Sequence, residues 1–296
     1  MIHIERAGFG STVQDRGRYG HVREGVPVSG PADPFAFRAA QALVGNTQAD
    51  AAIEAIGLPF SFRCESSRII AVTGREVSVV VRDSVPAWTS LFVRGGDLVT
   101  IDGTARSRYT YVAMSGGIAT PLVLGSRAAY PRAGLGEMLR SGDALALGDA
   151  RLSAEDAGRT VAFEYDDAVA ALPGPHLTRF DDGSLAQLFS APFAVSAQSD
   201  RQGVRLEGPG VAPREGEILT CGVVAGAVQV PRGGQPIVLL ADHQTTGGYP
   251  IIATVIGADV GLVAQRAPGE TLSFYRVDRE RALARGRERV VSLASA

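Results

Sequence analysis

Residues 235–256, which read QPIVLLADHQTTGGYPIIATVI, place a polar loop between two short apolar segments. Segments 237–240 and 251–256 are rich in β-branched residues, a pattern typical of strands that are buried on both faces. Gly247 and Gly248 are sufficient to reverse the chain in a hairpin between them. The polar residues before this glycine pair are not needed for the turn. We therefore predict that the loop lines a small-molecule pocket at the mouth of an apolar core.

The overall composition limits the classes of protein to consider. The chain has 296 residues, of which 45% are hydrophobic, with 36 glycines and 16 prolines. At roughly 150 residues per domain, this length favours two domains in a soluble, loop-rich protein. The formal net charge of -2 gives no electrostatic basis for binding nucleic acid or an anionic membrane. The sequence shows no secretory leader and no apolar segment of about 20 residues, so we expect a cytoplasmic protein.

All 29 basic residues are arginine, and the sequence contains no lysine. Genome composition is the simplest cause, but the chemical consequence does not depend on it. A Walker-type phosphate loop, a Schiff base and the attachment of biotin all require a lysine. We therefore expect any ATP to be bound wholly or partly by a partner, and any biotin to be carried on a separate chain. Cys64 and Cys221 are expected to be buried small residues, and no metal ligands occur at catalytic spacing.

The spacing of apolar runs predicts a mainly β protein. From residue 53 to residue 101, short apolar or alternating runs are separated by Gly, Asp or Ser. Many short strands at close spacing favour a barrel or a sandwich over a parallel α/β sheet. Residues 33–45 predict a helix, because Asp33 is a suitable N-cap and Gly45 can end the helix in the left-handed conformation. The charged segment 278–289 predicts a further helix.

A change of composition after Asp149 predicts the domain boundary. The segment ARLSAEDAGRT at 150–160 is typical of a linker between two strand-rich halves. We therefore predict an N-terminal domain of residues 1–152 and a C-terminal domain of residues 153–296. The strands of the second domain are expected to begin near Val161.

Three turn regions of the N-terminal half carry candidate ligand groups. Gln14 and Asp15 either hold an anionic substrate or tie a loop to the edge of a sheet. Ser29 and Asp33, at the start of the predicted helix, can offer a carboxylate and backbone amides to a ligand. The glycine pair that includes Gly117 permits close backbone approach, and its free amides are a candidate oxyanion or carboxylate site.

The C-terminal half contains two further candidates besides the loop. Arg201 and Arg205 are spaced to share one face of a strand. Arginine is suited to bidentate recognition of a carboxylate, although paired arginines are also common on solvated surfaces. Gln229 lies within the short apolar run 228–231. A polar residue in such a run is either a satisfied core amide or a ligand contact.

Several motifs identify a family resemblance along nearly the whole chain. They are VQDRGRYG (13–20), GVPVSGPAD (25–33), LVGN (43–46), GGI and LGSR (116–127), SDRQGVRL (199–206), QVP (229–231) and DHQTTGGYP (242–250). Through them the sequence resembles the KipA-like carboxyltransferase family, which includes allophanate hydrolase subunit 2 and the C subunit of 5-oxoprolinase. Gln41, Gln202 and residues 220–222 depart from the family pattern, which bears on substrate details.

The resemblance implies a mainly β fold of two cyclophilin-like β-barrel domains with a few short helices. It also implies work as one member of a complex, with a KipI-like subunit and often a LamB/YcsF-like subunit. Such complexes open 5-oxoproline to glutamate at the expense of ATP, and we expect this function. Fused relatives instead move a carboxyl group from carboxybiotin to urea. The alternatives are therefore a biotin-dependent carboxyltransferase acting on urea or a similar amide, and a non-catalytic regulatory partner of a KipI-like protein.

Both substrates contain an amide, so the site needs donors for a carbonyl oxygen and a base near a nitrogen. Asp242 and His243 are the predicted catalytic residues, because either can transfer the amide proton. A structural histidine bonded to the neighbouring loop is the alternative for His243. Arg201 is predicted to bind a substrate carboxylate. The full set of predicted substrate-binding residues is Gln244, Thr245, Thr246, Gly247, Tyr249, Gln229, Arg201, Gly117, Gln14, Asp15, Ser29 and Asp33.

Overall fold

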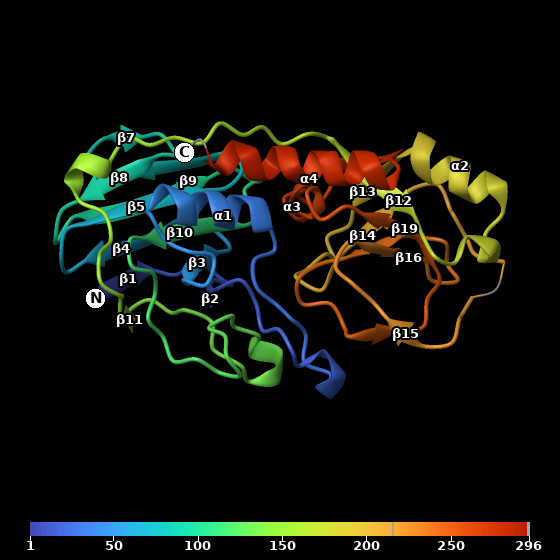
Figure 1. Ribbon diagram of the computed structural model, residues 1–296, viewed down its shortest axis with the longest axis horizontal. Coiled ribbons are helices and arrows are strands. Elements are labelled where there is room, and N and C mark those ends of the chain that lie inside the picture. The colour runs from blue at the N-terminus through green and yellow to red at the C-terminus, as the bar shows by residue number, and fades with distance from the viewer. Residues whose placement is uncertain (215, 295–296) are drawn as a thin grey trace. The chain divides into compact units, whose positions relative to one another are not determined.

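The computed structural model describes residues 1–214 and 216–294, which form two compact units (Figure 1). Unit 1 comprises Met1–Tyr19, Ser29–Glu164 and the residues from Val290 onward. Unit 2 comprises Gly20–Val28 and Tyr165–Arg289. Within the described residues, no helix combines the length and the apolar character that crossing a membrane requires.

Unit 1 is built on two antiparallel sheets with the strand orders β11-β1-β4-β9-β6-β7 and β2-β3-β10-β5-β8. The strands are β1 (Ile2–Arg6), β2 (Thr12–Gln14), β3 (Ala52–Ala55), β4 (Phe60–Cys64), β5 (Arg68–Thr73), β6 (Val77–Val80), β7 (Ser84–Val85), β8 (Ser90–Val93), β9 (Leu98–Gly103), β10 (Thr110–Met114) and β11 (Ala144–Leu145). The predicted succession of short strands between residues 53 and 101 is confirmed.

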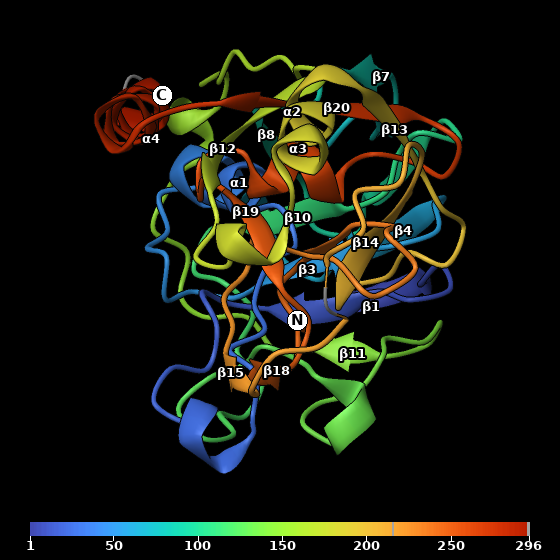
Figure 2. The ribbon, with the colours of Figure 1, turned by 90° about the vertical axis from the view of Figure 1, so that its right-hand side faces the viewer.

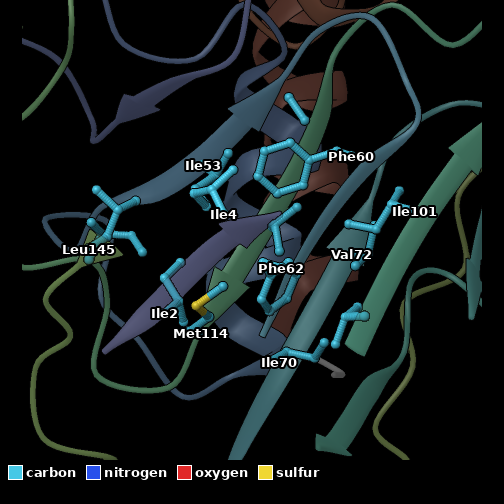
Figure 3. Packing of buried hydrophobic residues seen from close by; sticks show 14 of the residues in the cluster. Ile2, Ile4, Ile53, Phe60, Phe62, Ile70, Val72, Ile101, Met114 and Leu145 are labelled. Carbon is cyan, nitrogen blue, oxygen red and sulfur yellow. The ribbon is translucent and has the colours of Figure 1, made fainter. Parts of the chain in front are cut away.

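One apolar cluster holds the two sheets together (Figure 3). The first sheet contributes Ile4 and Phe62, and the second contributes Ile53, Val72 and Met114. Each of these side chains is at most 1% exposed. Burial of one large apolar side chain stabilises a fold by roughly 1.5–3 kcal/mol relative to leaving it in water. The cluster therefore provides unit 1 with a core that both sheets share.

Helix α1 (Pro34–Leu43) covers part of the second sheet and begins as predicted. The carboxylate of Asp33 accepts hydrogen bonds from the N–H groups of Phe35 and Ala36, which satisfies two amides of the first turn. Gly45 has φ +69°, the left-handed conformation expected after the end of the helix. The ring of Phe37 packs edge-on against the ring of Tyr111 of β10, with 5.9 Å between the ring centroids.

The segment 153–164, which we assigned to the C-terminal domain, lies in unit 1. The N–H of Val161 donates to the carbonyl oxygen of Trp88, and the ring of Phe163 stacks on the Trp88 indole at 5.3 Å. The strand expected near Val161 is not formed, and this part of the chain makes only an isolated β-bridge. The first strand of unit 2 is β12 (Ala168–Pro173).

Unit 2 is a closed barrel with the strand order β12-β19-β16-β17-β14-β13-β20, in which β20 closes the ring by pairing in parallel with β12. Its other strands are β13 (Pro192–Val195), β14 (Gly203–Glu207), β16 (Ala227–Gln229), β17 (Ile237–Leu239), β19 (Ile251–Val255) and β20 (Thr271–Arg276), with the separate pair β15 (Cys221–Gly222) and β18 (Thr246–Gly247). Both views show β15 outside the barrel wall, and Figure 2 shows β18 beside it. The chain is thus mainly β, as predicted.

Short helices complete the chain. They are α2 (Asp182–Ser190), α3 (Val260–Ala264), α4 (Arg279–Ala294) and the 3-10 turns η1 (Val22–Glu24), η2 (Pro131–Ala133), η3 (Ala154–Asp156) and η4 (Leu177–Arg179). The charged helix predicted at 278–289 is confirmed as α4 and extends beyond that range. Its first turn is capped by Asp278, whose carboxylate accepts from the N–H of Arg281. The guanidinium of Arg285 pairs with the buried carboxylate of Asp259, which fixes the helix to unit 2.

The two apolar segments of the opening stretch form strands, but the predicted hairpin between them is wrong. β17 pairs with β14 and β16, whereas β19 pairs with β12 and β16. Strand β16 therefore lies between them. The loop 240–250 connects β17 to β19, which lie on opposite sides of β16. Its residues Thr246 and Gly247 form β18, which pairs with β15, so they do not make a simple turn.

Candidate functional site

A polar cleft of about 160 Å³ lies on the outer face of the barrel in unit 2. Strand β14 shows which face this is, because Val204 and Leu206 are buried in the barrel while Arg205 and Glu207 are exposed. The cleft is lined by Gln198, Asp200, Gln202, Gly203, Arg205, Gln229, Ile237, Leu239, Gln244 and Tyr249. Strands supply its floor, and the loops before β14 and after β17 supply its rim.

A row of directly opposed residues crosses three strands in this floor. Arg205 of β14 lies opposite Ile237 of β17, which in turn lies opposite Gln229 of β16. Directly opposed residues of antiparallel strands point to the same face. The row therefore presents a guanidinium, an apolar side chain and a carboxamide side by side. The neighbouring row, which includes Val204 and Val238, faces the barrel core.

Gln229 is the most deeply buried polar group of the cleft, at 1% exposure. Its Oε1 accepts a hydrogen bond of 3.1 Å from Nε2 of Gln244. Its own Nε2 has no hydrogen-bond partner among the described residues. Buried donors are nearly always satisfied, so an unsatisfied one requires a specific explanation. The sequence left open whether Gln229 is a satisfied core amide or a ligand contact, and the unsatisfied Nε2 favours the ligand contact.

A bulge and a glycine shape the space around the Gln229 amide. Val228 pairs with Ala253 but Gln229 pairs with Ile251, so β19 has one additional residue at this point. Such bulges redirect the neighbouring side chains and are frequent beside functional sites. A Cβ added to Gly247 would lie 2.5 Å from Nε2 of Gln229. The absence of a side chain at Gly247 therefore leaves room for the amide.

Arg201 and Asp242 bind each other instead of lining the cleft. The guanidinium Nε and Nη2 of Arg201 lie 2.7 and 3.1 Å from the two carboxylate oxygens of Asp242. Their side chains are 14% and 8% exposed, respectively. This bidentate pair ties the turn before β14 to the loop after β17. Neither residue belongs to the cleft lining, and Arg201 precedes β14, so the predicted strand face shared with Arg205 is wrong.

Arg205 is the arginine that lines the cleft. It is exposed, and its guanidinium makes no hydrogen bond or ion pair with another described residue. The sequence paired it with Arg201 but gave no reason to prefer it. The alternation of buried and exposed residues in 203–207 is the signal that places it on the outer face.

His243 adopts a defined tautomer beside the cleft. Its Nδ1 lies 2.6 Å from the carbonyl oxygen of Gln244 and must carry the proton, because a carbonyl oxygen only accepts. Burial lowers the pKa of His243 below its ordinary value, although the hydrogen bond to Gln244 and the charge of Asp242 act in the opposite direction. The neutral imidazole therefore keeps a lone pair on Nε2, which suits a general base. His243 itself does not line the cleft.

The other predicted residues of the loop divide into two groups. Gln244 and Tyr249 line the cleft. Thr245 and Thr246 do not. The carbonyl oxygen of Thr245 accepts from the N–H of Val223, and Thr246 pairs with Gly222 in the small sheet.

In unit 1, Gln14 and Asp15 are part of a network that joins loops. Oδ1 of Asp15 accepts from the N–H of Gly17 and the hydroxyl of Ser126, and Oδ2 accepts from the N–H of Arg127. Nε2 of Gln14 donates to the hydroxyl of Thr12 and a backbone carbonyl, while its Oε1 is buried without a partner among the described residues. Of the two interpretations given for these residues, the geometry of Asp15 favours the loop-tying one.

The remaining unit 1 candidates are Asp33, Ser29 and the glycine pair. The carboxylate of Asp33 caps α1. Ser29 is buried with φ +56°, and its hydroxyl has no hydrogen-bond partner in the described chain. The amides of Gly116 and Gly117 are not free, because they donate to Oδ1 of Asn46 and to the carbonyl oxygen of Met114. The predicted oxyanion site at this glycine pair is therefore wrong.

The two thiols are free and differ in their surroundings. Cys64 is buried as predicted, and burial raises the pKa of its thiol to about 11. Cys221 is only partly buried, because it belongs to the small sheet outside the barrel. Across residues 1–214 and 216–294, the structure contains no group of three or more His, Cys, Asp or Glu side chains arranged to hold a metal ion.

The fold is a closed seven-strand barrel with a polar cleft on its outer face, in a chain that contains a second mainly β unit. The chain belongs to the carboxyltransferase domain family, subdomains A and B, whose family model matches residues 24–276. The resemblance found in the sequence is thereby confirmed.

The chain is similar over nearly its whole length to two named relatives, each of them the C subunit of a bacterial 5-oxoprolinase. It is 35% identical to the protein of Escherichia coli K12, over 96% of this chain and 93% of the relative. It is 32% identical to the protein of Haemophilus influenzae, over 95% of this chain and 93% of the relative. A solved structure of the urea carboxylase of Kluyveromyces lactis matches 99% of this chain with a TM-score of 0.86 at 27% identity. The chain spans only 29% of that protein.

Proposed function

We propose that this chain is a subunit of an ATP-dependent 5-oxoprolinase complex that opens 5-oxo-L-proline to L-glutamate. Its likeness to the C subunit of 5-oxoprolinase from two bacteria covers 93% of each relative, which supports this assignment. The observation in the chain itself that carries the proposal is the buried, unsatisfied Nε2 of Gln229 in the cleft. A lactam carbonyl is the acceptor that this donor lacks.

Ring opening adds water across the lactam C–N bond, so the carbonyl carbon gains the oxygen of water and the nitrogen gains a proton. A hydrogen bond from Gln229 to the carbonyl oxygen would stabilise the negative charge that develops there. His243 does not line the cleft but precedes Gln244, which does, and with a neutral ring and an Nε2 lone pair it is our candidate for the proton transfer. Asp242 is a weaker candidate, because both of its carboxylate oxygens are bound to Arg201.

ATP and the partners belong to the same proposal. The chain has no lysine for a Walker-type loop, so we assign ATP wholly or partly to a partner. The partners we propose are a KipI-like subunit and a LamB/YcsF-like subunit. The test mixes the three purified chains with 5-oxoproline and ATP and measures glutamate. Glutamate should form only in the complete mixture, and undiminished formation without this chain would refute the proposal.

The second candidate is a biotin-dependent carboxyltransferase that acts on urea or a similar amide. The description of the family and the match of 99% of this chain to urea carboxylase favour it. Against it, the chain covers only 17% of the urea amidolyase of Saccharomyces cerevisiae, at 28% identity. Carboxylation of urea that depends on a biotin carrier, with no glutamate from 5-oxoproline, would establish this alternative. A regulatory partner of a KipI-like protein would bind that protein and support neither reaction.

A further inference from the structure

We propose that Gln229 and Arg205 form a two-point binding site for a small molecule with a carbonyl oxygen at one end and a carboxylate at the other. Gln229 would donate to the carbonyl, and Arg205 would bind the carboxylate. The identification of the ligand as 5-oxoproline rests on the proposed function, but the two contacts are argued from the cleft alone.

The first contact follows from the burial of Gln229. Gln229 is 1% exposed, and its Nε2 has no hydrogen-bond partner among the described residues. Such a donor destabilises the folded chain, because it has lost its hydrogen bonds to water. Gln229 lines the cleft, so a ligand in the cleft would lie beside the side chain that carries this donor. The bulge opposite Gln229 and the missing side chain at Gly247 keep the amide at this position. The site is thus shaped around an unsatisfied donor.

The second contact follows from the strand register. Arg205 and Gln229 are both opposite Ile237, so their Cα atoms are separated by two strand spacings, roughly 10 Å. Their side chains rise from the same face and leave a short gap over Ile237 and Leu239, which line the cleft. A small ring with apolar methylene groups fits between a carbonyl and a carboxylate in this gap.

The charges of the cleft give the ligand one orientation. Asp200 also lines it, and its Oδ1 accepts from the N–H groups of Gln202 and Gly203. This carboxylate repels an anionic group, whereas the Arg205 guanidinium attracts one. Arginine binds carboxylates in a bidentate geometry that lysine does not provide. The carboxylate of the ligand is therefore placed at Arg205 and its carbonyl at Gln229.

The test is a calorimetric titration of the full chain with 5-oxo-L-proline. Two comparison ligands separate the contacts, since proline lacks the ring carbonyl and 2-pyrrolidinone lacks the carboxylate. Both should bind more weakly than 5-oxoproline. Arg205→Gln should weaken the binding of 5-oxoproline by about 10-fold to 100-fold, the usual effect of losing a charged hydrogen bond. The same variant should not weaken the binding of 2-pyrrolidinone. Arg276→Gln, which changes an exposed arginine of β20 outside the cleft, is the matched control.

Gln229→Met separates ligand binding from a structural role. Methionine has a similar shape but no amide, so binding should weaken by about 3-fold to 10-fold. The melting temperature should stay the same or rise, because the unsatisfied donor is removed. A structural glutamine would show the reverse, a lower melting temperature with unchanged binding. That result would overturn the assignment, as would equal binding by wild type and Arg205→Gln or the absence of 5-oxoproline binding.

The outcomes also distinguish this site from the proposed function. If the reconstituted complex forms glutamate with an unchanged KM in both variants, the site is wrong and the function stands. If the chain binds 5-oxoproline through both residues but the complex forms no glutamate, the site stands and the function fails.

Discussion

At the residue scale, the pair Arg201–Asp242 illustrates how a polar residue of a conspicuous motif can serve structure. We expect Asp242→Ala to lower the free energy of unfolding by about 3 kcal/mol, because it removes the carboxylate that pairs with a largely buried guanidinium. Urea denaturation measures this change. Arg201→Ala should cost a similar amount, and the double variant should cost clearly less than the sum of the two. Full additivity of the two effects would show that the pair contributes nothing.

His243 provides a pH-dependent prediction at the same scale. Its pKa lies below the ordinary value of 6.5, chiefly through burial. Well above pH 6.5 both folded and unfolded chains hold it neutral, so it contributes no pH dependence to stability there. As the pH falls below 6.5 the unfolded chain binds the proton first, and this residue then lowers stability. NMR titration of the imidazole should give a pKa below 6.5, with the proton on Nδ1 at neutral pH. A pKa above 6.5 would contradict the proposal that His243 acts as a neutral general base.

The arginines and Gln229 show what a sequence reveals of single residues. The sequence placed Gln229, Gln244, Gly247 and Tyr249 in a candidate pocket, and the cleft contains or adjoins all four. It selected Arg201 over Arg205, although only Arg205 lines the cleft. The correct choice between the two arginines depends on where β14 begins and on the pairing of Arg201 with Asp242, which is 41 positions away in the chain. Neither fact is encoded in local spacing.

At the element scale, the start of α1 tests the role of Asp33. Asp33→Ala should lower the free energy of unfolding by about 1–2 kcal/mol, because two amides of the first turn lose their acceptor. Asp33→Asn keeps an oxygen acceptor and should retain most of the stability. Thermal unfolding of the two variants makes the comparison. If Asp33→Ala unfolds at the wild-type temperature, the cap is not a stabilising element.

The small sheet beside the barrel offers a matched pair of glycines. A Cβ at Gly247 would lie 2.5 Å from Nε2 of Gln229, whereas a Cβ at Gly248 would meet nothing nearer than 3.6 Å. Gly247→Ala should therefore displace the Gln229 amide and weaken 5-oxoproline binding several-fold. Gly248→Ala should bind like wild type. Equal affinities in titrations of both variants would show that Gly247 does not hold the amide in place.

The hairpin error has a physical cause at this scale. Segments 237–240 and 251–256 were predicted as buried strands, and they are β17 and β19. Their apolar pattern reports burial, which is a property of each strand alone. Which strand lies between them depends on strand pairing. That strand is β16, which comes earlier in the chain than either of them. Glycines in the loop suggested a tight turn, but Gly247 instead pairs with β15.

At the scale of the whole molecule, the mainly β class was predictable from the regular spacing of strands, but the limits of the units were not. The composition of 150–160 resembles a linker, yet the carbonyl oxygen of Arg159 accepts from the N–H of Ser90. Segment 20–28 belongs to unit 2 although the residues on both sides of it belong to unit 1. Contacts between distant parts of the sequence decide such membership, and composition does not report them.

The absence of lysine leads to a prediction for the whole complex. Biotin is carried on a lysine amine, and this chain has none, so any biotin must enter on another polypeptide. For a 5-oxoprolinase, avidin should leave glutamate formation by the reconstituted mixture unchanged, because no step uses biotin. For a biotin-dependent carboxyltransferase, avidin should abolish turnover by trapping the carrier, and prior addition of free biotin should restore it. Since the chain itself offers avidin no target, inhibition would locate the cofactor on a partner and would contradict the 5-oxoprolinase assignment.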